Sequence, residues 1–308
     1  MRRKRTLFSL AFGLTLLALL IYKNEPEQLG RTLASLKLTW WAGALLLYLM
    51  AQVISSYRWQ ILLKAEEILI PLSRLITFYF AGMFFNLFLP TTVGGDALRG
   101  YIMYNSTEKR EAAAVSVLVE RFIGMGALLM IGLVAALITR LEMALWPMVA
   151  LNILFFLLIL IASHEGLSHL PVRLLYRFGL RRWGESASRL YRAFRLYGSH
   201  RRALIKAGVL SFILQSLGVL GYYLLGRALN VSISPLYFFL FIPLVTAASM
   251  LPITFSGLGV REGASLVLFS QVGVPAATAI SLGLSWWLTV TLLSLLGTPL
   301  WVRRGIMG

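Results

Sequence analysis

The 308-residue chain contains no cysteine and only one aspartate, Asp96. Without cysteine it can form no disulfide framework, thiolate metal site or iron–sulfur cluster. Its three histidines fall in one basic stretch and have no partner at metal-ligand spacing, so we expect no metal site and no cofactor. Walker A, G-x-S-x-G and HExxH motifs are also absent, which argues against ATP-driven transport and simple hydrolase chemistry.

Charged residues are scarce and mostly basic. They make up 13% of the chain, with 12 Asp and Glu against 29 Lys and Arg, while 58% of the residues are hydrophobic. A mean hydropathy of +0.79 is too high for a soluble domain of this size, so the chain is predicted to be an integral membrane protein. The positive charge lies between apolar runs, which favours anionic lipid headgroups over nucleic acid as its partner.

Apolar segments of spanning or near-spanning length predict an all-α polytopic membrane protein that forms a single domain, 1–308. The first segment is long and lacks a cleavage site, so it predicts an uncleaved membrane span rather than a signal peptide. The segments are 6–22, 38–55, 75–90, 111–138, 145–162, 207–226, 235–251, 262–274 and 276–299.

The basic loop 163–206 sets the predicted orientation. The positive-inside rule places this loop and both termini in the cytoplasm of a cell with a cytoplasmic (inner) membrane. If 75–90 crossed the bilayer completely, the basic loop would lie outside, so we predict that 75–90 re-enters and returns through 97–105. Within the loop, 186–199 has the basic amphipathic pattern of an interfacial helix on anionic lipid.

Two Gly- and Pro-containing breaks resemble each other. "LPTTVGGDALRG" (89–100) aligns without gaps with "LPITFSGLGVRE" (251–262), and the predicted topology makes the two copies enter from opposite faces. Paired interrupted segments in inverted halves are the sequence pointer to a transporter site. We therefore predict an inverted repeat of two re-entrant hairpins, with halves at 38–138 and 207–299. The identical pairs are Leu89 and Leu251, Pro90 and Pro252, Thr92 and Thr254, Gly95 and Gly257, and Arg99 and Arg261.

The first break has the residues of a phosphate site. Proline ends the incoming helix, and glycines let the backbone turn tightly and approach a ligand. Asp96 is predicted to N-cap a helix beginning at Ala97, with Arg99 in its first turn. Arg99 and the exposed N–H groups suit a phosphate, and Arg261 would offer the same chemistry to the other leaflet.

The "VERF" motif places Glu120 and Arg121 deep in the 111–138 helix, about 13 Å from its start. A charge there costs at least about 2.5 kcal/mol, so both should face the protein interior and be paired. Adjacent helical residues point about 100° apart. We therefore expect Glu120 to pair with Arg99 or Arg261, and Arg121 with Asp96 or Glu262. Permanent ion pairs that only hold broken helices together remain the alternative to a functional role.

With "FNLFLPTTVGGDALRGY", "VLVERFIGM" and "LPITFSGLGVREGA" in this order, the chain resembles the lysylphosphatidylglycerol synthase transmembrane-region family. This flippase-like membrane domain also forms the N-terminal part of the multiple peptide resistance factor. The resemblance spans roughly residues 8–300 and implies re-entrant helices and a role in handling lipids. The candidate substrate-binding residues that it implies are Pro90, Gly94, Gly95, Asp96, Arg99, Glu120, Arg121, Pro252, Gly257, Gly259, Arg261 and Glu262.

Three functions remain open. The first is a flippase-like transporter of a phospholipid or polyprenyl-linked lipid. The second is a membrane enzyme acting on a lipid-linked phosphate or sugar, with Asp96 or Glu120 as the base. The third is an accessory subunit that works with a separate synthase or glycosyltransferase. No soluble aminoacyl-transferring domain follows in the sequence up to Gly308, so we expect this chain not to be an enzyme.

Overall fold

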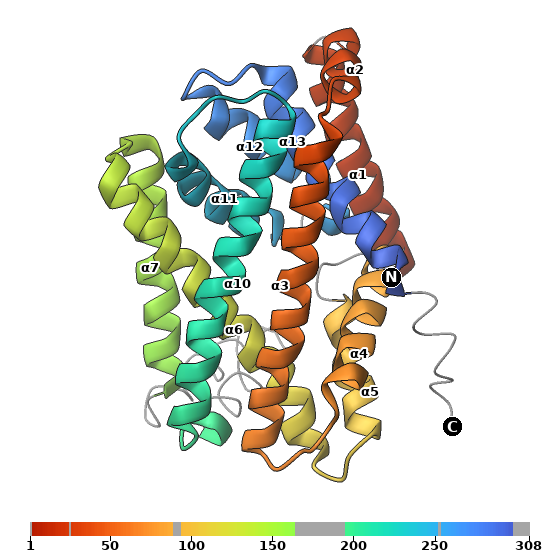
Figure 1. Ribbon diagram of the computed structural model, residues 1–308, viewed down its shortest axis with the longest axis vertical. Helices are drawn as coiled ribbons and strands as arrows, with labels where there is room; N and C mark the ends of the chain where they lie inside the picture. The colour runs from red at the N-terminus through yellow and green to blue at the C-terminus, as the bar shows by residue number, and fades with distance from the viewer. Residues whose placement is uncertain (1, 25, 89–93, 164–194, 252–253, 298–308) are drawn as a thin grey trace.

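A computed structural model of the chain describes residues 2–24, 26–88, 94–163, 195–251 and 254–297 (Figure 1). All regular structure in these ranges is helical, which confirms the predicted all-α fold class. The predicted site residues Pro90 and Pro252 lie outside the described residues. So do residues 164–194 of the basic loop, which include most of the predicted interfacial helix 186–199.

Most of the helices follow one another with short connections. In chain order they are α1 (Arg2–Lys23), α2 (Pro26–Ala34), α3 (Leu38–Ala65), α4 (Leu72–Asn86), α5 (Gly94–Asn105), α6 (Arg110–Thr139), α7 (Glu142–Ser163), α10 (Arg201–Ala228), α11 (Pro235–Ser249), the 3₁₀ turn η1 (Phe255–Gly257), α12 (Val260–Ser270) and α13 (Ala276–Leu295).

Long apolar helices make this a multi-pass membrane protein. Five helices in the described ranges are long and apolar enough to cross a bilayer: α3, α6, α7, α10 and α13. α10 packs along α3, and α6 contacts both of them (Figure 1). The described apolar part of α1, Leu10–Lys23, and α11 are shorter.

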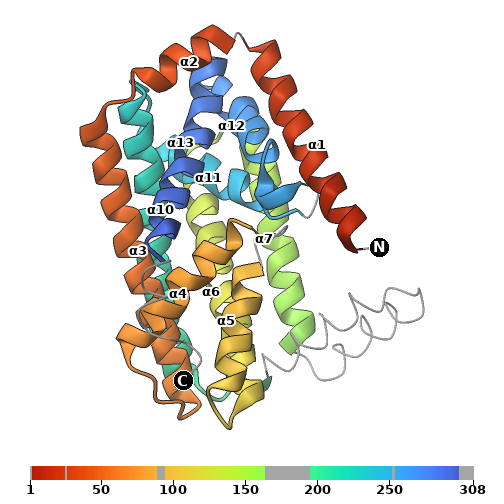
Figure 2. The same cartoon turned by 90° about the vertical axis from the view of Figure 1, so that its right-hand side faces the viewer.

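The short helices form two pairs in opposite halves of the molecule. In both views α4 and α5 lie side by side in the lower half, and α11 and α12 lie in the upper half (Figure 2). Lys109, just after α5, contacts the Glu67 carboxylate at 2.5 Å and the Glu66 carbonyl at 3.0 Å, just before α4. The α4–α5 hairpin therefore begins and ends at the same end of the molecule. Its re-entry into a bilayer and the inverted repeat stay predictions.

The largest apolar core joins α6, α7 and α10 to α11, α12 and α13. Phe269 of α12 makes edge contacts with Phe238 and Phe241 of α11, with ring centroids 5.0 and 5.1 Å apart. Gly226 of α10 lies directly against the Phe238 ring, where a Cβ would collide with it. This packing fixes α11 and α12 against the long helices.

The first internal span was predicted too short. The sequence places it at 38–55 because polar residues follow, but α3 continues to Ala65. The added turns are polar yet buried: Arg58 and Gln60 are 4% and 8% exposed. They tolerate burial because both find partners, Gln60 by donating to the Ile70 carbonyl at 2.8 Å and Arg58 by pairing with an acid on α6. The sequence also missed α2.

Candidate functional site

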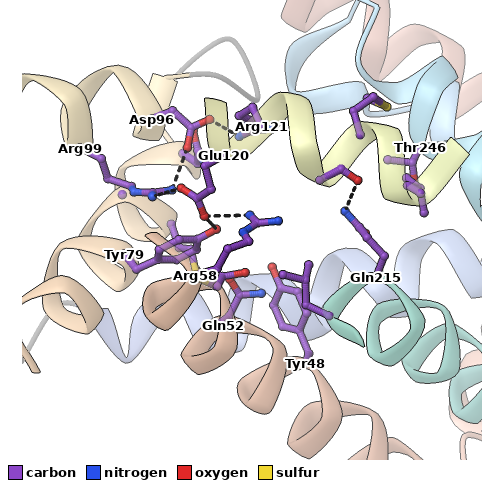
Figure 3. Close-up of a pocket in the computed structure, with 18 of the residues that line it drawn as sticks. Tyr48, Gln52, Arg58, Tyr79, Asp96, Arg99, Glu120, Arg121, Gln215 and Thr246 are labelled. Carbon is purple, nitrogen blue, oxygen red and sulfur yellow. Dashed lines mark hydrogen bonds and ion pairs between the residues drawn. The ribbon is translucent and has the colours of Figure 1, made fainter. Parts of the chain in front are cut away.

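Glu120 of α6 is the centre of a buried ion-pair network (Figure 3). Its carboxylate accepts hydrogen bonds from Arg58 of α3 at 2.9 Å and from Arg99 of α5 at 2.5 Å. The Tyr79 hydroxyl of α4 donates to the same carboxylate at 3.3 Å, and Arg58 also donates to Ser211 of α10 at 2.6 Å. The two arginine side chains and that of Glu120 are 2–5% exposed. The network thus ties five helices together.

Asp96 extends the network toward the protein surface. Arg99 donates to its carboxylate at 3.2 Å, and Arg121 of α6 forms an ion pair with the other carboxylate oxygen. The Arg121 side chain is 39% exposed, so this end of the network is open to its surroundings. Of the two partners predicted for each residue, the structure pairs Glu120 with Arg99 and Arg121 with Asp96.

Aromatic rings and a close backbone approach fix the position of Arg99. Its guanidinium lies 4.2 Å from the Trp59 ring centroid and 3.9 Å from that of Tyr79, on two different helices. Gly95 lies so close to the Gly82 carbonyl that a Cβ would overlap it. Stacking between two rings orients the flat guanidinium fork.

The predicted N-cap is wrong. α5 begins at Gly94 rather than Ala97, so Asp96 lies inside the first turn and its carboxylate is engaged by arginines. The Asn86 side chain accepts instead from the Gly95 amide at 2.6 Å. Gly95 was expected to approach a ligand, but its missing side chain makes room for the α4 backbone.

A cavity of about 310 Å³ opens beside the network. Gln215 and Thr246 lie across it from the ion pairs (Figure 3). Its polar lining consists of Tyr48, Gln52, Ser55, Arg58, Tyr79, Asn86, Asp96, Arg99, Glu120, Arg121, Gln215 and Thr246. We call this cavity the network pocket.

A second cavity of about 410 Å³ contains Arg261, whose guanidinium donates to the Ser256 carbonyl at 3.2 Å. Most of its other lining is apolar, including Leu87, Phe88 and Trp287. We call it the Arg261 pocket. It shares lining residues with the network pocket, namely Tyr48, Met83 and Asn86, so the two adjoin.

The other predicted residues of the second break shape the start of α12. Gly257 and Gly259 have φ values of +75° and +81°, which favour glycine. The Gly259 amide donates to the Glu262 carboxylate at 2.7 Å, and Glu262 is fully buried. Neither Glu262 nor Gly94 lines either pocket. The structure therefore groups Asp96, Arg99, Glu120 and Arg121, and places Arg261 in the adjoining cavity.

The sequence reading missed Arg58, which contacts Glu120 as directly as Arg99 does. A signal for it was present. Gln52, Ser55, Ser56 and Trp59 recur at the helical spacing i, i+3, i+4, i+7, and all four are buried on α3. A polar stripe with this period predicts a continuing helix with an internal polar face.

Comparison with known proteins gives one family match. The model of the family described as the lysylphosphatidylglycerol synthase TM region matches residues 6–297. The chain belongs to this family. No match was found among the curated proteins. As a member of the lysylphosphatidylglycerol synthase transmembrane family, the chain is a membrane protein related to lipid handling. The network pocket lies within the matched region. Among the described residues of this family member, no group of three His, Asp or Glu side chains could hold a metal ion.

Proposed function

We propose that this family member is a flippase-like transporter that moves the headgroup of a phospholipid or polyprenyl-linked lipid across the cytoplasmic membrane. The observation that carries the proposal is the pair of adjoining pockets, each with an arginine, inside a multi-pass helical protein. A headgroup crossing the bilayer needs a polar path, because uncompensated burial of a charge in hydrocarbon is costly.

The network pocket supplies the chemistry for a phosphate. Arginine presents N–H donors in a planar fork that matches phosphate oxygens. Arg99 is held in one orientation by the Trp59 and Tyr79 rings, so less conformational freedom is lost when it binds. Arg121, at the exposed end of the network, supports entry of the headgroup there.

The Arg261 pocket supplies the next position for the headgroup and an apolar wall for its chains. Phe88 and Trp287, which line it, are 65% and 43% exposed and so reach the outer surface of the helices. Acyl or prenyl chains can then stay in the bilayer while the headgroup lies inside. Tyr48, Met83 and Asn86 border both pockets, which supports passage from Arg99 to Arg261.

The test is transbilayer movement in liposomes. The purified chain is reconstituted, and headgroup accessibility to an external quencher is followed for phospholipids and a polyprenyl phosphate. We expect movement faster than in protein-free vesicles. Arg99→Lys keeps the charge but loses the fork, and should slow movement by about tenfold or more. Arg74→Lys, at an exposed arginine of α4, is the matched control. Equal rates with and without protein for every lipid would refute the proposal.

A further inference from the structure

The lining of the two pockets has more basic than acidic side chains. The two linings together contain four arginines and two carboxylates, which leaves a formal excess of two positive charges. Lysine and histidine are absent from both linings among the described residues. The six residues are Arg58, Arg99, Arg121, Arg261, Asp96 and Glu120.

Both lining carboxylates are already occupied by arginine. Glu120 lies between Arg58 and Arg99, and Asp96 lies between Arg99 and Arg121. Glu262 is close in sequence to Arg261, but it is fully buried, lines neither pocket and binds the Gly259 amide. An ammonium group entering either pocket would therefore meet guanidinium groups and no carboxylate that is not already paired among the described residues.

The same network has donors in surplus. The Nε–H groups of Arg58 and Arg99 are buried and have no acceptor among the described residues. Both arginine residues are more than nine-tenths buried. These donors add to the excess of guanidinium over carboxylate groups in the lining, which favours a ligand that brings acceptor oxygens. Neutral polar groups from Gln52, Ser55 and Gln215 also line the network pocket, and they suit hydroxyl groups rather than charge.

We infer that this site takes a lipid headgroup whose phosphate is not balanced by an amine. The class includes a phosphatidylglycerol-type diester and a polyprenyl phosphate monoester, and it disfavours ethanolamine and aminoacylated headgroups. This inference rests on the proposed function and names its substrate class. Lysylphosphatidylglycerol, the lipid in the family's description, carries two amines on its lysyl group and falls in the disfavoured class.

The first experiment measures binding alone. The purified full chain in detergent is titrated with dihexanoyl phosphatidylglycerol, dihexanoyl phosphatidylethanolamine, dihexanoyl lysylphosphatidylglycerol and farnesyl phosphate. We expect the two amine-containing lipids to bind about tenfold or more weakly than dihexanoyl phosphatidylglycerol, because like charges repel at the site. Farnesyl phosphate distinguishes the polyprenyl source from the glycerolipid source. Equal or tighter binding of the amine-containing lipids would overturn the inference.

A variant tests whether the network sets this preference. Arg121→Gln removes the partly exposed partner of Asp96 and leaves the buried ion pairs of Glu120 in place. Phosphatidylglycerol should bind several-fold more weakly, while phosphatidylethanolamine binds as well as before or better, because Asp96 has lost a competing cation. Arg74→Gln should change neither. An equal loss of affinity for both lipids would indicate a purely structural Arg121 and contradict the inference.

Movement of the same headgroups in vesicles separates the two proposals. If phosphatidylglycerol binds preferentially but no lipid moves faster than in protein-free vesicles, the transport function fails and the headgroup assignment stands. If amine-containing lipids bind and move as fast as phosphatidylglycerol, transport stands and the assignment fails.

Discussion

At the scale of single residues, Glu120 is the shared partner of two buried arginines. Arg58 and Arg99 both donate to its carboxylate, and each is almost fully removed from the surface. A buried ion that loses its partner is far more costly than a surface ion, because no water replaces the lost contact. Glu120 is therefore the residue on which the buried arginines depend.

Glu120→Gln should destabilise the protein by about 3–5 kcal/mol, because the buried Arg58 loses its carboxylate and the buried Arg99 keeps only that of Asp96. The measurement is the free energy of unfolding in detergent. Glu142→Gln, at an exposed glutamate in the first turn of α7, should change stability by less than about 0.5 kcal/mol. Similar values for the two variants would contradict the central role of Glu120.

The sequence predicted these pairs better than it predicted the complete network. Depth in the α6 helix and the 100° step between neighbours predicted Arg99 or Arg261 as the partner of Glu120, and Asp96 or Glu262 as that of Arg121. The structure forms the first pair of each. Arg58 was missed because the predicted span 38–55 ends before it, whereas the α3 helix continues to Ala65. The role of any of these residues in lipid binding stays a prediction.

At the scale of elements, the α4–α5 hairpin depends on two glycines that touch through their backbones. Gly82 and Gly95 lie in facing helices, and Gly82 also contacts the Arg99 side chain. The sequence correctly placed a break between the helices, but not the first residue of α5, because the amide acceptor comes from Asn86 on the preceding helix. Local pattern cannot reveal such a partner.

Gly95→Ala should destabilise the protein by about 2 kcal/mol or more, because the new Cβ would overlap the Gly82 carbonyl group and push α4 and α5 apart. Gly100→Ala in the same helix is the matched control. A Cβ at Gly100 meets nothing within 4 Å, and alanine favours a helix by about 0.5–1 kcal/mol. Unfolding in detergent should therefore shift in opposite directions for the two variants. Equal shifts would exclude close packing as the cause.

At the scale of the whole molecule, contacts between the loops that join the helices show which loops lie at the same end of the protein. The links around Glu66 and Lys109 meet the start of α10, where His200 lies 3.2 Å from the Glu66 carboxylate. At the other end, the Lys37 amide donates to the Ala228 carbonyl at 3.0 Å. The positive-inside rule predicts that the first end lies in the cytoplasm, since the basic loop precedes α10.

The absence of cysteine makes this orientation easy to test. Glu108→Cys, between α5 and α6, should react with a membrane-impermeant maleimide only after cells are lysed. Ser232→Cys, between α10 and α11, should react in intact cells, and both positions are exposed. The parent chain, which has no thiol, gives the background. Labelling of Glu108→Cys in intact cells would refute the re-entrant assignment of α4 and α5.

The helices that carry the ion-pair network differ greatly in length from one another. α3, α6 and α10 contain 28, 30 and 28 residues and measure about 42–45 Å, against a hydrocarbon core about 30 Å thick. α4 and α5 contain 15 and 12 residues and measure only about 18–22 Å. Lipids around the long helices and beside the hairpin therefore meet surfaces of unequal height. Acyl-chain length should consequently affect the activity of this protein, because thickening the bilayer changes the tilt of the long helices.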